Sequence, residues 1–77
     1  FLSVDARLAE YLLAHVDAEG HLAATQQEIA AAIGSAREVV SRRLDTMSKR
    51  GWLSHARGRV HVQDPEALRY LLAENAG

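Results

Sequence analysis

Three charged residues near the middle of the chain, Arg37, Glu38 and Arg42, have side chains that could read the edges of base pairs. An arginine guanidinium can donate two hydrogen bonds to O6 and N7 of guanine, and a glutamate carboxylate can accept one from the N4 amino group of cytosine. Arg37 and Glu38 are expected in the first turn of an α-helix, and Arg42 lies one turn beyond Glu38 on the same exposed side. We interpret them as candidates for base contacts in duplex DNA.

The basic charge of the chain is concentrated around these residues. The whole chain has a net charge of −1, but residues 35–62 contain seven Arg or Lys against two acidic residues, a local charge of +5. Residues 1–34 carry −4 and residues 63–77 carry −2. Because a local basic patch attracts phosphate whatever the overall charge, the distribution favours a nucleic-acid partner.

Two plainer interpretations stand beside this one. Charged residues at these spacings can be an ordinary solvated helix face. Glu38 and Arg42 can also form a surface ion pair worth about 0.3–0.5 kcal/mol, and pairing and base contact can both occur at different times.

The elements that must position these residues have clear start and stop signals. Thr25-Gln26-Gln27-Glu28 and Ser35-Ala36-Arg37-Glu38 both have the form of a capping box, ten residues apart, with Gly34 between them. They predict two short-linked helices, the second from Ser35 to Arg50 and ended by Gly51. This spacing is typical of a helix-turn-helix.

The second helix has a predicted inward side. Its apolar residues recur at spacings of four, four and three, at Ala36, Val40, Leu44 and Met47. The residues expected to point outward are Arg37, Glu38, Ser41, Arg42 and Asp45.

The flanking segments complete a fold that is mainly α with a small β-hairpin. We expect a helix from Val4 to Val16 capped by Ser3, and a brief strand at His21-Leu22-Ala23. A hairpin follows, from Leu53 and across a turn at residues 56–59 to Val60-His61-Val62. Asp64-Pro65-Glu66 starts a last helix, which should fray over residues 74–77. These elements predict one winged helix-turn-helix domain over residues 1–77.

Composition excludes several other classes of protein. The 77 residues suffice for one core, 48% are hydrophobic, and no apolar run approaches the ~20 residues of a membrane span. There is no cysteine, and the spacings of His15, His21, His55 and His61 fit no zinc pattern, so we expect no metal site. No acid pair or nucleophile with a base stands out, which argues against an enzyme. Trp52 could stack on a base, but just after a helix end it is expected to be a core or staple residue.

One stretch of sequence resembles a known family. The run TQQEIAAAIGSAREVVSRRLDTMSKRGWL, followed by RGRVHVQDPEALRYL and preceded by DARLAEYLLAHV, closely resembles the C-terminal DNA-binding domain of the Crp-Fnr family of bacterial transcription regulators. The most specific portion is QEIAAAIGSAREVVSR, where Q-E-I-A, G and R-E-x-V-x-R fall at the family's spacing. The resemblance implies that Arg37, Glu38 and Arg42 contact bases.

The same resemblance implies partners and missing parts. It implies a homodimer on a two-fold-symmetric duplex site, RNA polymerase as a further partner, and a cytoplasmic location without membrane contact. The family has a ligand-sensing β-barrel and a dimerisation helix upstream, and the start at Phe1-Leu2-Ser3 without Met suggests a segment of such a longer regulator. We therefore expect any effector to bind outside this domain, which needs no cofactor.

Two positions depart from the family pattern, because Ala36 and Val39 stand where Ser or Thr hydroxyls often touch phosphate. Substitutes for backbone contact are Thr25, Gln26, Ser41, Arg43, Arg57 and Arg59.

The competing hypothesis is a winged-helix domain that binds another protein instead of DNA. A protein-binding face would be expected to show Leu, Tyr or Phe where this sequence has charged residues.

Overall fold

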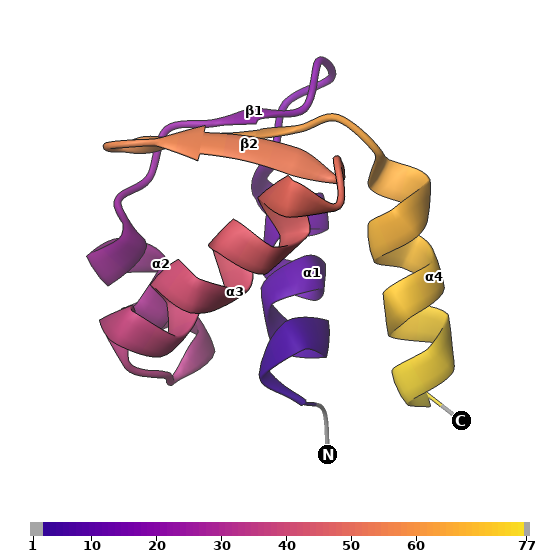
Figure 1. Ribbon diagram of the computed structural model, residues 1–77, viewed down its shortest axis with the longest axis horizontal. Coiled ribbons are helices and arrows are strands. Elements are labelled where there is room, and N and C mark those ends of the chain that lie inside the picture. Colours follow the sequence, from indigo (N-terminus) through magenta and orange to yellow (C-terminus); the bar gives the residue numbers. More distant parts are fainter. Residues whose placement is uncertain (1–2, 77) are drawn as a thin grey trace.

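The computed structural model describes residues 3–76 and contains four helices and one three-stranded sheet (Figure 1). In chain order the elements are α1 (Val4–His15), β1 (His21–Leu22), α2 (Gln26–Ile33), α3 (Arg37–Lys49), β2 (Leu53–Ala56), β3 (Arg59–Val62) and α4 (Pro65–Ala76). The sheet covers one end of the helices, and α2 and α4 lie on opposite sides of α1 and α3. The predicted winged helix-turn-helix is confirmed.

Three of the four helices begin where polar side chains satisfy free backbone N–H groups. The Ser3 hydroxyl accepts from the N–H of Ala6 at 3.1 Å, and the Asp64 carboxylate accepts from the N–H of Ala67 at 3.2 Å. At α2 the predicted capping box is present in both directions between Thr25 and Glu28. These contacts stabilise the helix starts by about 1 kcal/mol each.

The predicted start of α3 is wrong. Its N-cap is Ala36, which makes no side-chain cap hydrogen bond, and the helix begins at Arg37 rather than at Ser35. The reason is that Ser35 still belongs to the end of α2: its N–H donates to the carbonyl of Ala30 at 2.9 Å, the six-to-one bond of a Schellman closure around Gly34. The N-cap of α3 therefore falls on Ala36, one residue later than predicted, and the capping box at Ser35 is not formed.

The sheet is antiparallel, with the order β1-β3-β2. Leu53 pairs with Val62 and Ala56 with Arg59, so the hairpin turn consists of residues 57 and 58. The brief strand predicted at residues 21–23 is formed by residues 21–22 and adds to the other edge of β3, with His21 opposite His61. The wing is thereby fixed to the segment between α1 and α2.

The turn in that segment is stabilised by Asp17, which follows the end of α1. Its carboxylate accepts backbone N–H groups of His21 and Glu19, both at 2.9 Å. The bond from the N–H of His21 is the main cause that lowers the pKa of Asp17.

The core lies between the helices and the inner face of the sheet. Its largest fully buried side chains are Leu8, Leu12, Ile29, Val40, Leu44, Leu53 and Leu68. Trp52 is half-buried against this core, as expected, and its carbonyl accepts the N–H groups of Gln63 and Asp64 at 2.9 Å each. The last helix continues through Ala76, so the predicted fraying of residues 74–76 is wrong, and Gly77 lies outside the described residues. Within residues 3–76 no helix has the length and apolar character to cross a membrane.

Two glycines with left-handed backbone give a test of how tightly the wing is fixed. Gly20 has a φ of 87°, and a Cβ there would lie 2.4 Å from the carbonyl oxygen of Val62, whereas Gly34 has a φ of 70° and open space. Gly34→Ala should lower the free energy of unfolding by about 1–2 kcal/mol through backbone strain alone. Gly20→Ala should lower it by more, because strand β3 must also shift. Urea unfolding measures both changes. If the two variants lost the same free energy of unfolding, the backbone around Gly20 would be able to move away from Val62 at no cost, and the wing would not be tightly fixed there.

Candidate nucleic-acid interface

One side of α3 is buried and fixes how the helix presents the other. Val40 and Leu44 are 0% exposed and Met47 is 2% exposed, as predicted. Ala36, predicted to continue this stripe, is exposed instead, because it precedes the helix and its backbone is extended. The inward side of α3 thus begins at Val40.

The three predicted base-contact residues lie on the exposed side of α3. Arg37, Glu38 and Arg42 are all exposed. Among residues 3–76 none of these side chains takes part in a hydrogen bond or an ion pair, and the alternative Glu38–Arg42 pair is not formed. Their donors and acceptors are therefore available to an outside partner.

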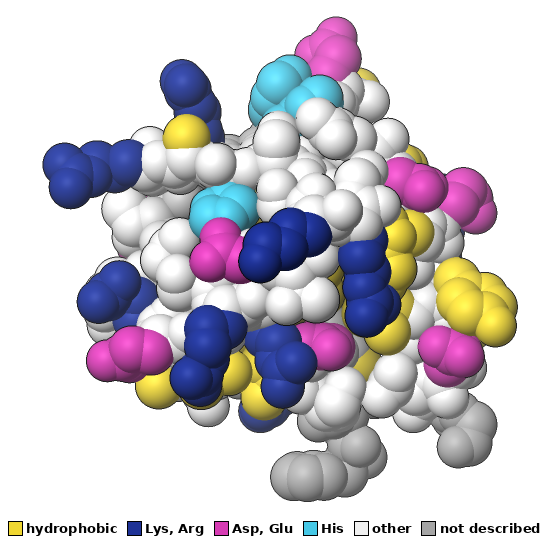
Figure 2. Space-filling model, viewed as in Figure 1, with side chains coloured by type: hydrophobic (Ala, Val, Ile, Leu, Met, Phe, Trp, Pro, Cys, Tyr) yellow, Lys and Arg dark blue, Asp and Glu magenta, His cyan; other side chains and the backbone are white. Residues whose placement is uncertain are grey.

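Basic side chains gather around α3 and the hairpin. Figure 2 shows Lys and Arg mainly over the left and centre of the molecule, where Figure 1 places these elements. The side over α4 carries acidic side chains and an exposed hydrophobic one, Tyr70, which is 67% exposed. The segmental charge distribution of the sequence is therefore also a spatial one.

An open hollow of about 550 Å³ brings several of the predicted backbone-contact residues together with one base-contact candidate. It lies between the start of α2, the start of α3 and the hairpin turn. Its lining residues are Thr25, Gln26, Gln27, Arg37, His55, Ala56, Arg57 and Gly58.

The start of α2 faces this hollow. The Thr25 hydroxyl accepts from the N–H of Glu28 at 3.0 Å, and the Glu28 carboxylate accepts from the N–H of Thr25 at 2.7 Å. This reciprocal pair fixes the first turn of α2, whose N-terminal dipole favours an anion. With Arg37 and Arg57 on the other walls, the hollow is suited to a phosphate group.

Gln27 and His55 also line the hollow, although neither was predicted to contact DNA. Gln27 follows Gln26 in the first turn of α2. Its position beside a predicted backbone contact could have indicated that it is a contact as well. His55 lies on β2, and only the fold shows that its side chain approaches both the hollow and α3.

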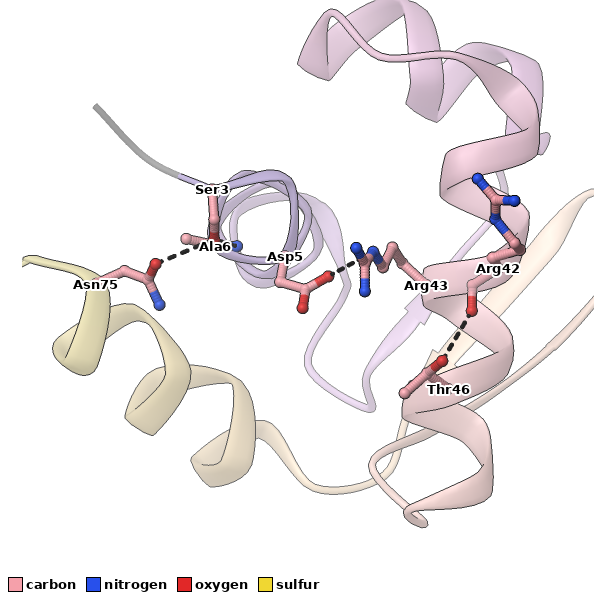
Figure 3. A network of polar contacts seen from close by, with 7 residues as sticks. All are labelled: Ser3, Asp5, Ala6, Arg42, Arg43, Thr46 and Asn75. Atoms are coloured by element: carbon pink, nitrogen blue, oxygen red, sulfur yellow. Dashed lines mark hydrogen bonds and ion pairs between the residues drawn. The ribbon is translucent and has the colours of Figure 1, made fainter.

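Arg43 lies apart from the other candidates. Its Nε is 3.3 Å from a carboxylate oxygen of Asp5, and both side chains are part exposed. Figure 3 shows Arg43 pointing toward α1, whereas the side chain of its neighbour Arg42 points away from α1. In this structure Arg43 therefore joins α3 to α1.

The remaining predicted contacts, Ser41 and Arg59, do not line the same hollow. Ser41 is half-buried on α3. Arg59 is exposed at the start of β3 and lines a second hollow of about 570 Å³ on the sheet, together with His21, His55 and His61. The structure thus brings Thr25, Gln26 and Arg57 together around one hollow with Arg37. Ser41 and Arg59 lie outside that hollow.

The histidines are engaged in other contacts. The rings of His21 and His61 stack with centroids 4.1 Å apart, and Nε2 of His55 is 2.9 Å from a carboxylate oxygen of Asp45. The described part of the chain contains no cluster of three or more potential metal ligands.

Comparison with known proteins decides the family. Residues 6–71 match the Crp-like helix-turn-helix domain. The chain belongs to this family. It is a helix-turn-helix domain of the type found in Crp/Fnr transcription regulators, as the resemblance implied.

Individual relatives agree in sequence and in structure. The transcriptional regulator SdrP of Thermus thermophilus is 38% identical over 72 residues, which cover 91% of this chain and 35% of that protein. The structure of a CRP/FNR-family transcriptional regulator from Thermus thermophilus superposes with a TM-score of 0.86 at 28% identity, covering 96% of this chain and 42% of the other.

A CRP-family regulator from the same organism gives a TM-score of 0.80 at 32% identity, with 92% and 40% of the two chains covered. The chain thus spans between about a third and two fifths of the length of these proteins. They are described as transcriptional regulators, which is not a catalytic role.

The missing cap of α3 gives a stability test. Ala36 has the extended backbone of an N-cap, with φ −79° and ψ 147°, but no hydroxyl to offer. Ala36→Ser should raise the free energy of unfolding by about 0.5–2 kcal/mol by satisfying an N–H in the first turn. The matched change Ala32→Ser, at an exposed position inside α2, should not raise it. Thermal unfolding of both variants measures the difference, and a gain at Ala32 as large as at Ala36 would contradict the capping explanation.

Proposed function

We propose that this domain binds duplex DNA in a sequence-specific way, with α3 in the major groove and Arg37, Glu38 and Arg42 contacting base edges. The observation that carries this proposal is the exposed and unpaired state of these three side chains: Glu38 and Arg42 lie opposite buried Val40 and Leu44, and Arg37 is exposed as the first residue of α3. Charged groups so held can form bidentate or single hydrogen bonds with bases without first breaking contacts within the protein.

Contacts to the phosphate backbone would fix the position of α3 in the groove. Thr25, Gln26 and Arg57 line the hollow beside Arg37, so one phosphate could be held between α2 and the wing. Ser41 and Arg59 lie at the margin of this surface. Arg43 would have to leave Asp5 to reach a phosphate, which costs little because ion pairs between exposed side chains contribute about 0–1 kcal/mol.

The longer regulator would act as a homodimer on a two-fold-symmetric site. Each α3 would then read one half-site, and the spacing of half-sites would follow from the dimer. In this proposal the protein works in the cytoplasm, an effector binds the part of the regulator outside this domain, and RNA polymerase is the partner that the bound dimer influences.

The competing hypothesis, binding of another protein, lacks a suitable anchor on α3. Protein interfaces are enriched in aromatic residues at their centre. The large hydrophobic residue that is exposed within residues 3–76 is Tyr70, and it lies on α4. The face of α3 offers charged groups instead.

Arg37→Ala tests the assignment of base contact. Against duplexes selected from a random pool by the unaltered chain, the variant should lose about 1–3 kcal/mol of binding free energy and its preference at one base pair. Competition binding on the selected duplex and its single-base variants measures both. The matched control is Arg69→Ala, which removes an arginine from α4 and should leave base preference unchanged.

The outcomes of this experiment separate the hypotheses. A loss of equal size on every duplex would identify Arg37 as a phosphate contact. If the unaltered chain bound no duplex even at low salt, the protein-interaction hypothesis would replace DNA binding.

Arg57→Ala tests the wing. Because each phosphate contact adds about 0.9 to the slope of log affinity against log salt concentration, the variant should lower that slope by about one. It should keep the base preferences of the unaltered chain. Titrations over a range of salt concentrations provide the measurement, and a changed base preference with an unchanged slope would disprove the wing assignment.

A further inference from the structure

One side-chain contact joins the two elements that the proposed function places on DNA. Nε2 of His55 on β2 lies 2.9 Å from Oδ1 of Asp45 on α3. The His55 side chain is 16% exposed and that of Asp45 is 58% exposed. The imidazole is therefore held inside the domain, while the carboxylate it bonds remains open to an approaching ligand.

Asp45 lies on the DNA-facing side of α3. It follows Glu38 and Arg42 at spacings of seven and three, so the three share one face of the helix. Seven residues at 1.5 Å each place Asp45 about 10 Å beyond Glu38 along the axis. When the first turns of α3 enter the groove, this part of the helix lies near the phosphate backbone, where a free carboxylate is repelled.

Asp45 is also the acidic group that faces His55. The other charged or titratable residues around His55 are cationic or imidazole groups: Arg37 and Arg57 line the first hollow with it, and Arg59, His21 and His61 line the second.

We propose that His55 is a positioning residue for DNA binding: it holds the Asp45 carboxylate against the wing and, when protonated, cancels its negative charge beside the phosphate backbone. This inference rests on the proposed function. With neutral imidazole the pair carries −1, and with imidazolium it carries no net charge. The affinity for duplex DNA therefore rises as the pH falls through the range in which histidine titrates, between about 5 and 8.

Two variants that keep the shape of the pair separate charge from structure. Asp45→Asn retains an oxygen acceptor for His55 but removes the charge, and His55→Gln retains a donor but cannot be protonated. The matched control is Glu66→Gln, which removes one negative charge from an exposed ion pair with Arg69 on α4.

Fluorescence anisotropy with a labelled random-sequence duplex, at constant ionic strength near pH 5.5 and near pH 8, measures the effect. The unaltered chain should bind about threefold more tightly at the lower pH, the size expected for one charge at about 7 Å from a phosphate in water. Asp45→Asn should bind near pH 8 as tightly as the unaltered chain does near pH 5.5. His55→Gln should be weak at both, apart from any pH dependence due to His15, His21 and His61, which all variants share.

Several outcomes would overturn the inference while leaving the proposed function intact. These are pH dependence in His55→Gln equal to that of the unaltered chain, no gain of affinity in Asp45→Asn near pH 8, or an equal gain in Glu66→Gln. Circular dichroism at both pH values checks folding, and if His55→Gln does not fold, His55→Asn, which also retains a donor and cannot be protonated, replaces it with the same expected result. Absence of duplex binding by every variant at both pH values would overturn the proposed function itself, and this inference with it.

Discussion

The burial of one side of α3 is the constraint on which the rest of the structure depends. Val40, Leu44 and Met47 enter a core shared with α1, α2 and the sheet, and together their burial contributes several kcal/mol. Since a helix is rigid about its own axis, this packing fixes the rotation of α3. Glu38 and Arg42 face away from the core as a result, whereas Arg37 is exposed because it is the first residue of the helix.

Local signals in the sequence predict most of the fold because each has a local cause. The capping box at Thr25 and the Asp64-Pro65 start are satisfied by atoms within a few residues, so their outcome depends little on the remaining chain. Ser35 shows where this reasoning fails. Its backbone N–H is already used to close α2, so the cap position of α3 falls on the next residue, Ala36, whose side chain has no acceptor.

The candidate site is predictable in part for the same reason. Helical periodicity is enough to expose Glu38 and Arg42, and the start of the helix exposes Arg37, whereas the assignment of all three to bases rests on side-chain chemistry and the family resemblance. The pairs Asp5–Arg43 and Asp45–His55 join different elements, and their geometry depends on how those elements pack. No spacing along the chain indicates that Arg43 turns toward α1 while Arg42 turns away.

The contact between the first and last helices has a consequence for how the domain can be attached to other polypeptides. The Ser3 hydroxyl donates to Oδ1 of Asn75 at 3.0 Å, although 72 positions separate them in the chain. Both residues lie at the pole opposite the sheet (Figure 1). A neighbouring module or a tether joined at either end therefore leaves the domain away from the wing, and a short peptide could close the chain into a ring without crossing it.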